Sequence, residues 1–164
     1  TIKIDNNILT IPISVESKTG HSLPSGTSFT REAWLEVIVK DEVTEDILFS
    51  SGIIETDTSN LNLLDDSDLL LYTSYLLDDN GTIIHSVTDA FDIDRQMLPA
   101  MEIDEHNYII EDTDNRFNSG VKLNISMRMR FRAFKPHLLV EFPELLARQP
   151  VFDMARIDIT YTIP

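Results

Sequence analysis

Cysteine is absent from this chain of 164 residues, and its absence excludes several kinds of chemistry. The chain can form no disulfide, no thiolate metal site and no covalent haem attachment through a Cys-x-x-Cys-His motif. It also has no apolar run long enough to span a bilayer, and no signal peptide is recognisable. Because the first residue is Thr1, we expect either a mature chain whose signal peptide has been removed or a fragment of a longer protein.

Positive charge is scarce. The chain has 13 Lys and Arg against 28 Asp and Glu, which gives a formal net charge of -15. An acidic surface repels phosphate backbones and anionic lipid headgroups, so we expect no nucleic-acid partner and no insertion into a membrane. A basic protein or a cation is the expected partner, although the same acidity is equally explained by a need for solubility.

Catalytic motifs are also missing. The sequence has no Gly-x-Ser-x-Gly elbow, no His-Glu-x-x-His pair and no phosphate-binding glycine loop. The four histidines, at positions 21, 85, 106 and 137, fall in separate segments without ligand spacing. We therefore expect a protein that is not an enzyme.

The chain does contain strong period-two alternation of apolar and polar residues, which is typical of half-buried strands. A length of 164 residues suits a single domain spanning residues 1–164. Pro12 interrupts the first strand and predicts an edge or a bulge there. The alternating apolar positions are Leu9 to Val15, Leu35 to Val39, Val121 to Phe131 and Ala155 to Ile163.

Turn-forming residues separate these runs, notably Leu23-Pro24-Ser25-Gly26, Ser51-Gly52, Asn118-Ser119-Gly120 and the hairpin candidate Asn80-Gly81. Apolar residues at helical spacing predict a short helical crossover near 136–148, split by Pro143. Residues 57–77 and 88–113 are interpreted as long connections with some strand content. One-sided strands favour an all-β fold with two antiparallel sheets packed as a sandwich.

An ordered series of motifs resembles the β-sandwich (Ig-like) domain attached to many bacterial multihaem c-type cytochromes. It begins with Thr19-Gly20-His21 and the Pro24-x-Gly26 turn, which lead into the strand that carries Trp34. Later segments agree in order: Leu77 to Gly81, Asp114-Asn115-Arg116, Ser119-Gly120, the arginine-rich strand and Phe152 to Ala155. The similarity covers roughly residues 9–163. Such domains normally continue a chain that carries haem-attachment sites, and this chain has none.

The resemblance implies a role for His21, which precedes the Pro24-x-Gly26 turn. Its imidazole is a candidate axial ligand for a haem held by a partner chain, and the alternative is a local bond to backbone that fixes the loop. Trp34 lies among alternating apolar residues and is predicted to be a packed core residue between the sheets, with a haem-proximal relay as the alternative.

Several acidic loops offer hard oxygen ligands at close spacing, as calcium requires. The candidate ligands are Asp78, Asp79, Asn80, Asp112 and Asp114. Each loop lacks a complete calcium motif, so solvated turns are the alternative, and Arg116 is expected to pair with Asp114. The row Arg128, Arg130 and Arg132 is predicted to form cross-strand ion pairs on the surface.

Together these features predict a haem-free binding or assembly module that associates with a multihaem c-type cytochrome and supports electron transfer in the periplasm or outside the cell. Haem would be met only through the partner, and homo- or hetero-oligomers are possible. The alternative is a calcium-binding extracellular structural or adhesive module, such as a filament or surface-layer subunit, in which exposed edge strands join subunits.

Overall fold

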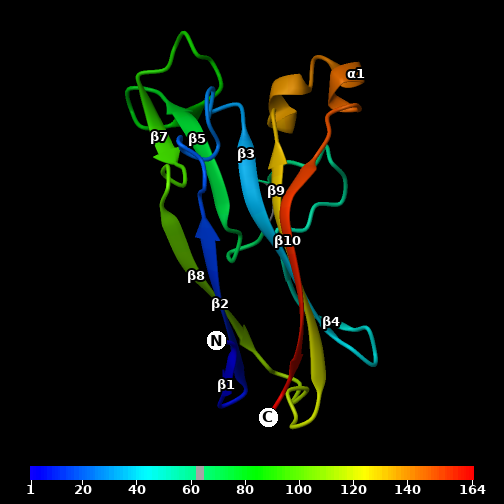
Figure 1. Cartoon of the computed structure of the whole chain (residues 1–164). Coiled ribbons are helices and arrows are strands. Elements are labelled where there is room, and N and C mark those ends of the chain that lie inside the picture. The colour runs from blue at the N-terminus through cyan, green and yellow to red at the C-terminus, as the bar shows by residue number, and fades with distance from the viewer. Residues whose placement is uncertain (62–64) are drawn as a thin grey trace.

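The computed structural model describes residues 1–61 and 65–164, which fold into two antiparallel β-sheets with very little helix (Figure 1). The smaller sheet has the strand order β1-β2-β8. The larger sheet has the order β10-β9-β3-β5-β6, with β4 also pairing with β3 and β7 with β5. The predicted two-sheet antiparallel sandwich is confirmed, and the immunoglobulin-like assignment stays a prediction.

Four of the strands follow the alternating sequence runs. They are β2 (Ile8–Glu16), β3 (Glu32–Asp41), β9 (Lys122–Arg132) and β10 (Phe152–Thr162). The remaining strands are β1 (Lys3–Asp5), β4 (Ile47–Ser51), β5 (Leu71–Leu77), β6 (Ile83–Ile84), β7 (Asp92–Gln96) and β8 (Ile103–Glu111).

Pro12 lies on an edge of β2, as predicted. The pairing of β1 with β2 ends at Thr10, so beyond that point only β8 is paired with β2. A proline is tolerated there because it lacks the N–H that a strand on both sides would require.

The main core lies between the two sheets. The smaller sheet contributes Leu9, Ile11, Tyr108 and Ile110, while the larger sheet contributes apolar side chains from β3 and β9. These side chains are almost completely removed from water, which makes their burial the chief stabilising contribution to the fold. The residues from the larger sheet are Leu35, Val37, Val39, Leu123, Ile125 and Met127.

Trp34 is a buried core residue, but the predicted position between the sheets is wrong. It is paired with Arg130 across the sheet, whereas its neighbour Leu35 is paired with Met129. Alternation places Trp34 on the outer face of the larger sheet, where its exposed fraction is 0% and its Nε1 donates to the carbonyl oxygen of Gly52 at 3.0 Å. The segment that follows β4 therefore covers Trp34, and β3 is buried on both faces.

The predicted helical segment consists of two short pieces between β9 and β10. A 3-10 helix covers Pro136–Leu139 and α1 covers Pro143–Leu146. Pro143 starts the second piece, so the predicted split is confirmed. The segment joins strands that are adjacent and antiparallel, so it connects neighbours without crossing over the sheet.

The four predicted turns are present, and the glycine in each has a positive φ angle. At Asn80-Gly81 the chain reverses between β5 and β6, as expected of a hairpin. Residues 57–77 contain β5, and residues 62–64 of that stretch lie outside the described residues. Residues 88–113 contain more strand than predicted, since β7 and β8 occupy most of them.

Candidate functional site

The predicted motif residues Thr19, Gly20, Pro24 and Gly26 lie in one loop between β2 and β3 with His21. The hydroxyl of Thr19 donates to the carbonyl oxygen of His21 at 2.7 Å. His21 is exposed, and its Nδ1 lies 3.3 Å from the carbonyl oxygen of Ser22. The local backbone bond described above as the alternative role of His21 is thus present, while a haem contact stays a prediction.

This loop is tied to the rest of the molecule at Leu23. The main-chain groups of Leu23 and Leu98 exchange two hydrogen bonds, of 2.8 and 3.0 Å. Arg31 closes the turn by donating from Nη1 to the carbonyl oxygen of Ser25 at 2.8 Å. The imidazole of His21 is therefore presented on a braced loop beside a shallow hollow of about 330 Å³ that Phe29 and Arg95 also line.

The carboxylates proposed as calcium ligands mainly cap their own turns. Asp78 accepts hydrogen bonds from the main-chain N–H groups of Thr82 at 2.8 Å and Asn80 at 2.9 Å, and these bonds lower its pKa. Asp79 accepts a bond from the side-chain amide of Asn80 at 2.7 Å. Such bonds are those of a stable polar turn.

Asp112 is buried and also serves its own loop. It accepts hydrogen bonds from the main-chain N–H groups of Phe117 and Asp114. Burial raises the pKa of Asp112, but the N–H donors and Arg116 outweigh it, so the pKa is lowered. The expected pair is present, with Arg116 Nη2 at 3.4 Å from Asp114. Within residues 1–61 and 65–164 no three His, Asp or Glu side chains are grouped to hold a metal, and calcium binding stays a prediction.

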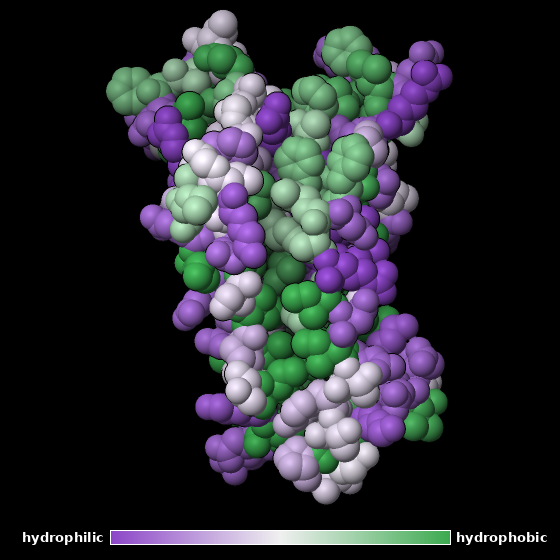
Figure 2. Space-filling view, viewed as in Figure 1, coloured by the Kyte–Doolittle hydropathy of each residue, from purple (hydrophilic) through white to green (hydrophobic). Residues whose placement is uncertain are grey.

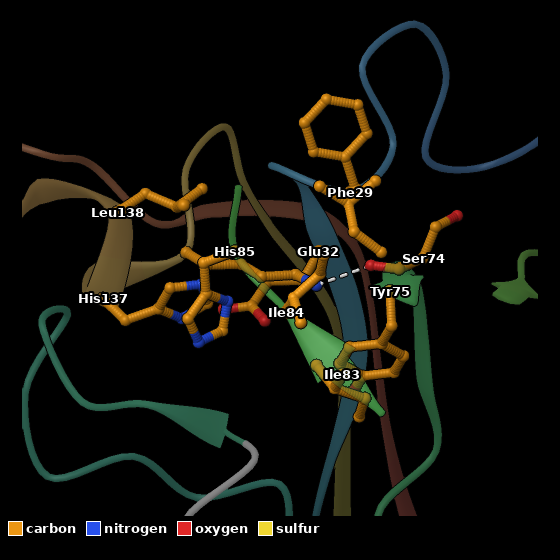
Figure 3. A pocket seen from close by; sticks show the side chains of 11 residues that line it. Phe29, Glu32, Ser74, Tyr75, Ile83, Ile84, His85, His137 and Leu138 are labelled. Carbon is orange, nitrogen blue, oxygen red and sulfur yellow. Dashed lines mark hydrogen bonds between the residues drawn. The ribbon is translucent and has the colours of Figure 1, made fainter. Parts of the chain in front are cut away.

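The structure brings together two histidines that the sequence separates by many residues. The rings of His85, after β6, and His137, in the 3-10 helix, have centroids 4.1 Å apart with planes inclined at 35° (Figure 3). They line a narrow, partly open pocket of about 30 Å³, which has room for about one water molecule. The pocket is too small for an organic substrate.

The charge state of this pocket follows from its burial. Desolvation lowers the pKa of His137 to about 4, with help from the positive charges of His85, Lys135 and Arg132. Burial also lowers the pKa of Lys135 to about 8, against the opposing charge of Glu32. Lys135 donates from Nζ to the carbonyl oxygen of Ser74 at 2.8 Å. The ammonium group of Lys135 thus hydrogen-bonds to the main chain, which is the behaviour of a structural residue.

The arginine row of β9 forms the cross-strand ion pairs that the sequence predicts. Arg128 and Arg130 both donate to Glu36, at 2.7 and 2.8 Å, and Arg132 donates to Glu32. The prediction that these pairs lie on the surface is wrong. Glu32 and Glu36 are each 3% exposed and Arg132 is 0% exposed, because the segment after β4 covers this part of the sheet.

Asp153 of β10 completes this polar layer. Its carboxylate lies 3.5 Å from Arg128 and 3.3 Å from Arg130. The three guanidinium groups therefore face three carboxylates, so their charges are matched within this layer, which is buried at Arg132 and partly exposed at Arg128 and Asp153. The row is unsuited to binding a phosphate or a carboxylate of a partner.

One edge of the sandwich is strongly acidic. We call it the acidic edge: residues 89–111, which comprise the end of the connection before β7, then β7, β8 and the connection between them, along the left side of Figure 1. Arg95 is the only Lys or Arg between residues 89 and 112. Two apolar side chains, Phe91 at 77% and Met101 at 71%, are exposed beside these carboxylates. The exposed carboxylates are Asp89, Asp92, Asp94, Glu102, Glu105 and Glu111.

The opposite edge is apolar. A trough of about 430 Å³ runs between β2 and β10, and it appears as the green band down the middle of Figure 2. The predicted half-burial of β10 is wrong: Ile157 is 57% exposed and Ile159 is 38% exposed. The smaller sheet has only three strands, so it does not cover the inner face of β10. The side chains that line the trough include Ile13, Val15, Leu35, Met127, Met129, Met154 and Ile157.

Comparison with known proteins finds a solved structure with a similar fold. By sequence, no protein family and no curated protein matches the chain. A solved structure of a penta-haem cytochrome c552 from Thermochromatium tepidum superimposes with a TM-score of 0.76 at 20% sequence identity. The fold resembles part of a multihaem cytochrome. The likeness covers 98% of this chain and 38% of that cytochrome, so this chain spans well under half the length of its structural neighbour.

Sequence reasoning missed the acidic edge and the histidine pair. The acidic edge is visible in the sequence only as a run of carboxylates, because nothing local shows that β7 and β8 lie at the edges of two different sheets. The stacking of His85 on His137 depends on the packing of β6 against the last connection, for which the sequence carries no signal.

Proposed function

We propose that this chain is a haem-free β-sandwich module that binds a multihaem c-type cytochrome and supports electron transfer by assembly, in the periplasm or outside the cell. The observation that carries the proposal is the fold likeness over 98% of the chain to part of a penta-haem cytochrome. Since the chain has no cysteine, it cannot attach haem through a Cys-x-x-Cys-His motif, and we propose that the haem is held by the partner. The module itself is proposed to be non-catalytic.

The acidic edge is the surface we assign to the cytochrome. Six exposed carboxylates and one cation attract a positively charged surface and accelerate its encounter, more than they add to final affinity. Phe91 and Met101 provide exposed apolar area among these charges. Aromatic and methionine side chains are enriched in protein interfaces, so the edge combines steering with contact area.

The loop of His21 is the second element of the proposed surface. Leu23 ties it to Leu98, which lies in the connection between β7 and β8, so the loop adjoins the acidic edge. An exposed imidazole on a braced loop can approach a haem edge or iron in a docked partner. This contact follows from the proposed association and needs its own measurement.

The test uses a multihaem cytochrome purified from the same organism and the immobilised full chain. We expect saturable binding that weakens as salt rises, because exposed charges are screened over about 10 Å at 0.1 M salt. The variant E102K/E105K reverses two charges on the acidic edge, and its association rate is expected to fall by about tenfold. The control E141K/E144K makes the same change in net charge at exposed positions, one just before α1 and one within it.

Two results would count against the proposal. Absence of binding by any multihaem cytochrome of the organism contradicts the association itself. Equal effects of E102K/E105K and E141K/E144K contradict the assignment of the acidic edge, since only total charge would then matter. The haem absorption spectrum on mixing, compared with that of H21A, reports whether His21 reaches the iron: a shift lost in H21A supports ligation, and an unchanged spectrum excludes it.

A further inference from the structure

β10 is a long edge strand whose charged side chains, Asp153, Arg156 and Asp158, all lie on its outer face. Its partner on one side is β9, and it ends the strand order of the larger sheet. Natural edge strands are commonly shielded by proline, inward-pointing charge or a bulge. β10 contains no proline, its bulge lies at its start between Asp153 and Ala155, and the inner face that follows bears Ala155, Ile157, Ile159 and Tyr161. The strand from Ala155 onward is therefore open to pairing.

The direction of the free main-chain groups follows from the hydrogen bonds to β9. Ile163 donates its N–H to the carbonyl oxygen of Val121 at 2.9 Å, so its main chain faces β9. The register has no shift between Ala155 and Thr162, and main-chain direction alternates along a strand. Arg156, Asp158 and Thr160 consequently direct their N–H and C=O groups to the free edge.

The charges of β10 are self-complementary about Ile157. In an antiparallel pair of two copies centred on Ile157, Arg156 of each copy lies opposite Asp158 of the other. Within one chain Arg156 already lies beside Asp158, with Nε at 2.7 Å from its carboxylate. In such a pair the two copies of Arg156 and the two copies of Asp158 each have one opposite charge on their own strand and another on the facing strand. Opposite charges on facing strands stabilise the pairing.

Other registers are worse. A shift centred on Asp158 places the two Asp158 side chains opposite each other, and a shift centred on Arg156 does the same for the arginines. Registers that pair an odd position with an even one set apolar inner-face residues opposite polar outer-face residues, because side chains alternate with period two. Registers centred on Ala155 or Ile159 keep the faces matched but set the charged residues opposite uncharged ones. Only the register centred on Ile157 sets Arg156 opposite Asp158 on matching faces.

We propose that two copies of this chain form a symmetric dimer by antiparallel pairing of β10 with β10 about Ile157. Arg156 and Asp158 of the two copies exchange main-chain hydrogen bonds, which the even-numbered positions leave available. On the inner face Ile157 meets its own copy and Ala155 meets Ile159, which removes exposed apolar area from water. The two larger sheets become continuous, and the contact closes because it is isologous.

The experiment exchanges the charges at the two positions. Sedimentation velocity of the wild-type full chain, without any cytochrome, is expected to show concentration-dependent dimers. R156D makes this part of the strand doubly acidic and D158R makes it doubly basic, so each variant alone is expected to dimerise at least about tenfold more weakly. The double variant R156D/D158R restores opposite charges and should recover the wild-type dimer.

Mixing supplies the decisive measurement. Equimolar R156D and D158R are expected to form a heterodimer of one acidic and one basic strand, which native mass spectrometry distinguishes by mass. The controls R95D and D92R make the same charge changes at exposed positions on β7, at the opposite edge, and should leave dimerisation unchanged. Circular dichroism and melting curves confirm that all variants fold.

A wild-type chain that stays monomeric to about 1 mM overturns the proposal. A dimer whose affinity responds equally to R156D and R95D overturns the interface, as does a mixture of R156D and D158R without heterodimer. Because no cytochrome is present, these outcomes are independent of whether the proposed function holds.

Discussion

Removal of Arg132 should strongly destabilise the fold. Arg132 is 0% exposed, donates to Glu32 and donates from Nη1 to the carbonyl oxygen of Asp57 at 2.9 Å. Its guanidinium carbon also lies 5.3 Å from the ring centroid of Trp34. In R132A the buried carboxylate of Glu32 loses its partner, and an uncompensated buried charge costs about 3–5 kcal/mol.

That loss is large beside the total free energy of unfolding of a domain, which is about 5–15 kcal/mol. The assay is urea unfolding followed by tryptophan fluorescence, which reports directly on Trp34, the single tryptophan. With a slope of about 2 kcal/mol per molar urea, the midpoint of R132A should fall by about 2 M. The exposed pair of Lys18 with Glu16 gives the control, because K18A should cost less than about 0.5 kcal/mol.

A double-mutant cycle separates the pair from packing. E32Q/R132M removes both charges at similar volume, and we expect it to be more stable than R132A by about 2–3 kcal/mol. An R132A variant as stable as K18A would refute the reasoning, as would a double variant whose loss equals the sum of E32Q and R132M.

The pH dependence gives a second check on the same pair. Burial raises the pKa of Glu32 above its usual value, even though Arg132 acts to lower it. A raised carboxyl pKa means that the folded state holds this proton more tightly than the unfolded state, so the contribution of Glu32 to stability falls as pH rises through that range. Without Arg132 the pKa rises further, and the deficit of R132A should shrink as the solution is made acidic.

Other predictions concern single positions. G52A should lose at least about 3 kcal/mol in urea unfolding, because Gly52 has a φ of 70° and an added Cβ would lie 2.3 Å from the carbonyl oxygen of Leu35. His137 should cost the wild type about 1–2 kcal/mol of stability between pH 7 and pH 4. Unfolded histidine takes up a proton near pH 6.5, whereas the lowered pKa of His137, about 4, delays this in the folded state, and solvent screening of the partly buried imidazole reduces the effect below the full value of the shift. H137Q should flatten that slope. D112A should cost about 1–3 kcal/mol of stability, because it leaves the main-chain N–H of Phe117 unpaired. Millimolar calcium should move the melting temperature of the wild type by less than about 1 °C, because the carboxylate of Asp112 already accepts that hydrogen bond. A larger rise would favour the calcium-binding alternative.

The strands and turns were predictable from the sequence because their signals are local. Alternation over Leu35 to Val39 and over Val121 to Phe131 marks strands whatever lies opposite them, and Pro143 splits a helix in any context. The strand β8 was not predicted, because Asp104 and His106 occupy inward positions, where a purely apolar pattern was expected. Asp104 is accommodated there because it accepts a hydrogen bond from the hydroxyl of Tyr72 at 2.8 Å.

What the sequence determined by itself was which side chains of one strand share a face: Arg128 with Arg130 and Arg132, and Ile157 with Ile159. Only the tertiary structure decided which faces are covered. The segment after β4 buries Trp34 and the ion pairs, while a sheet of three strands leaves the inner face of β10 in water. The physical reason is that periodicity is a property of neighbouring residues, whereas burial depends on segments that are distant in sequence.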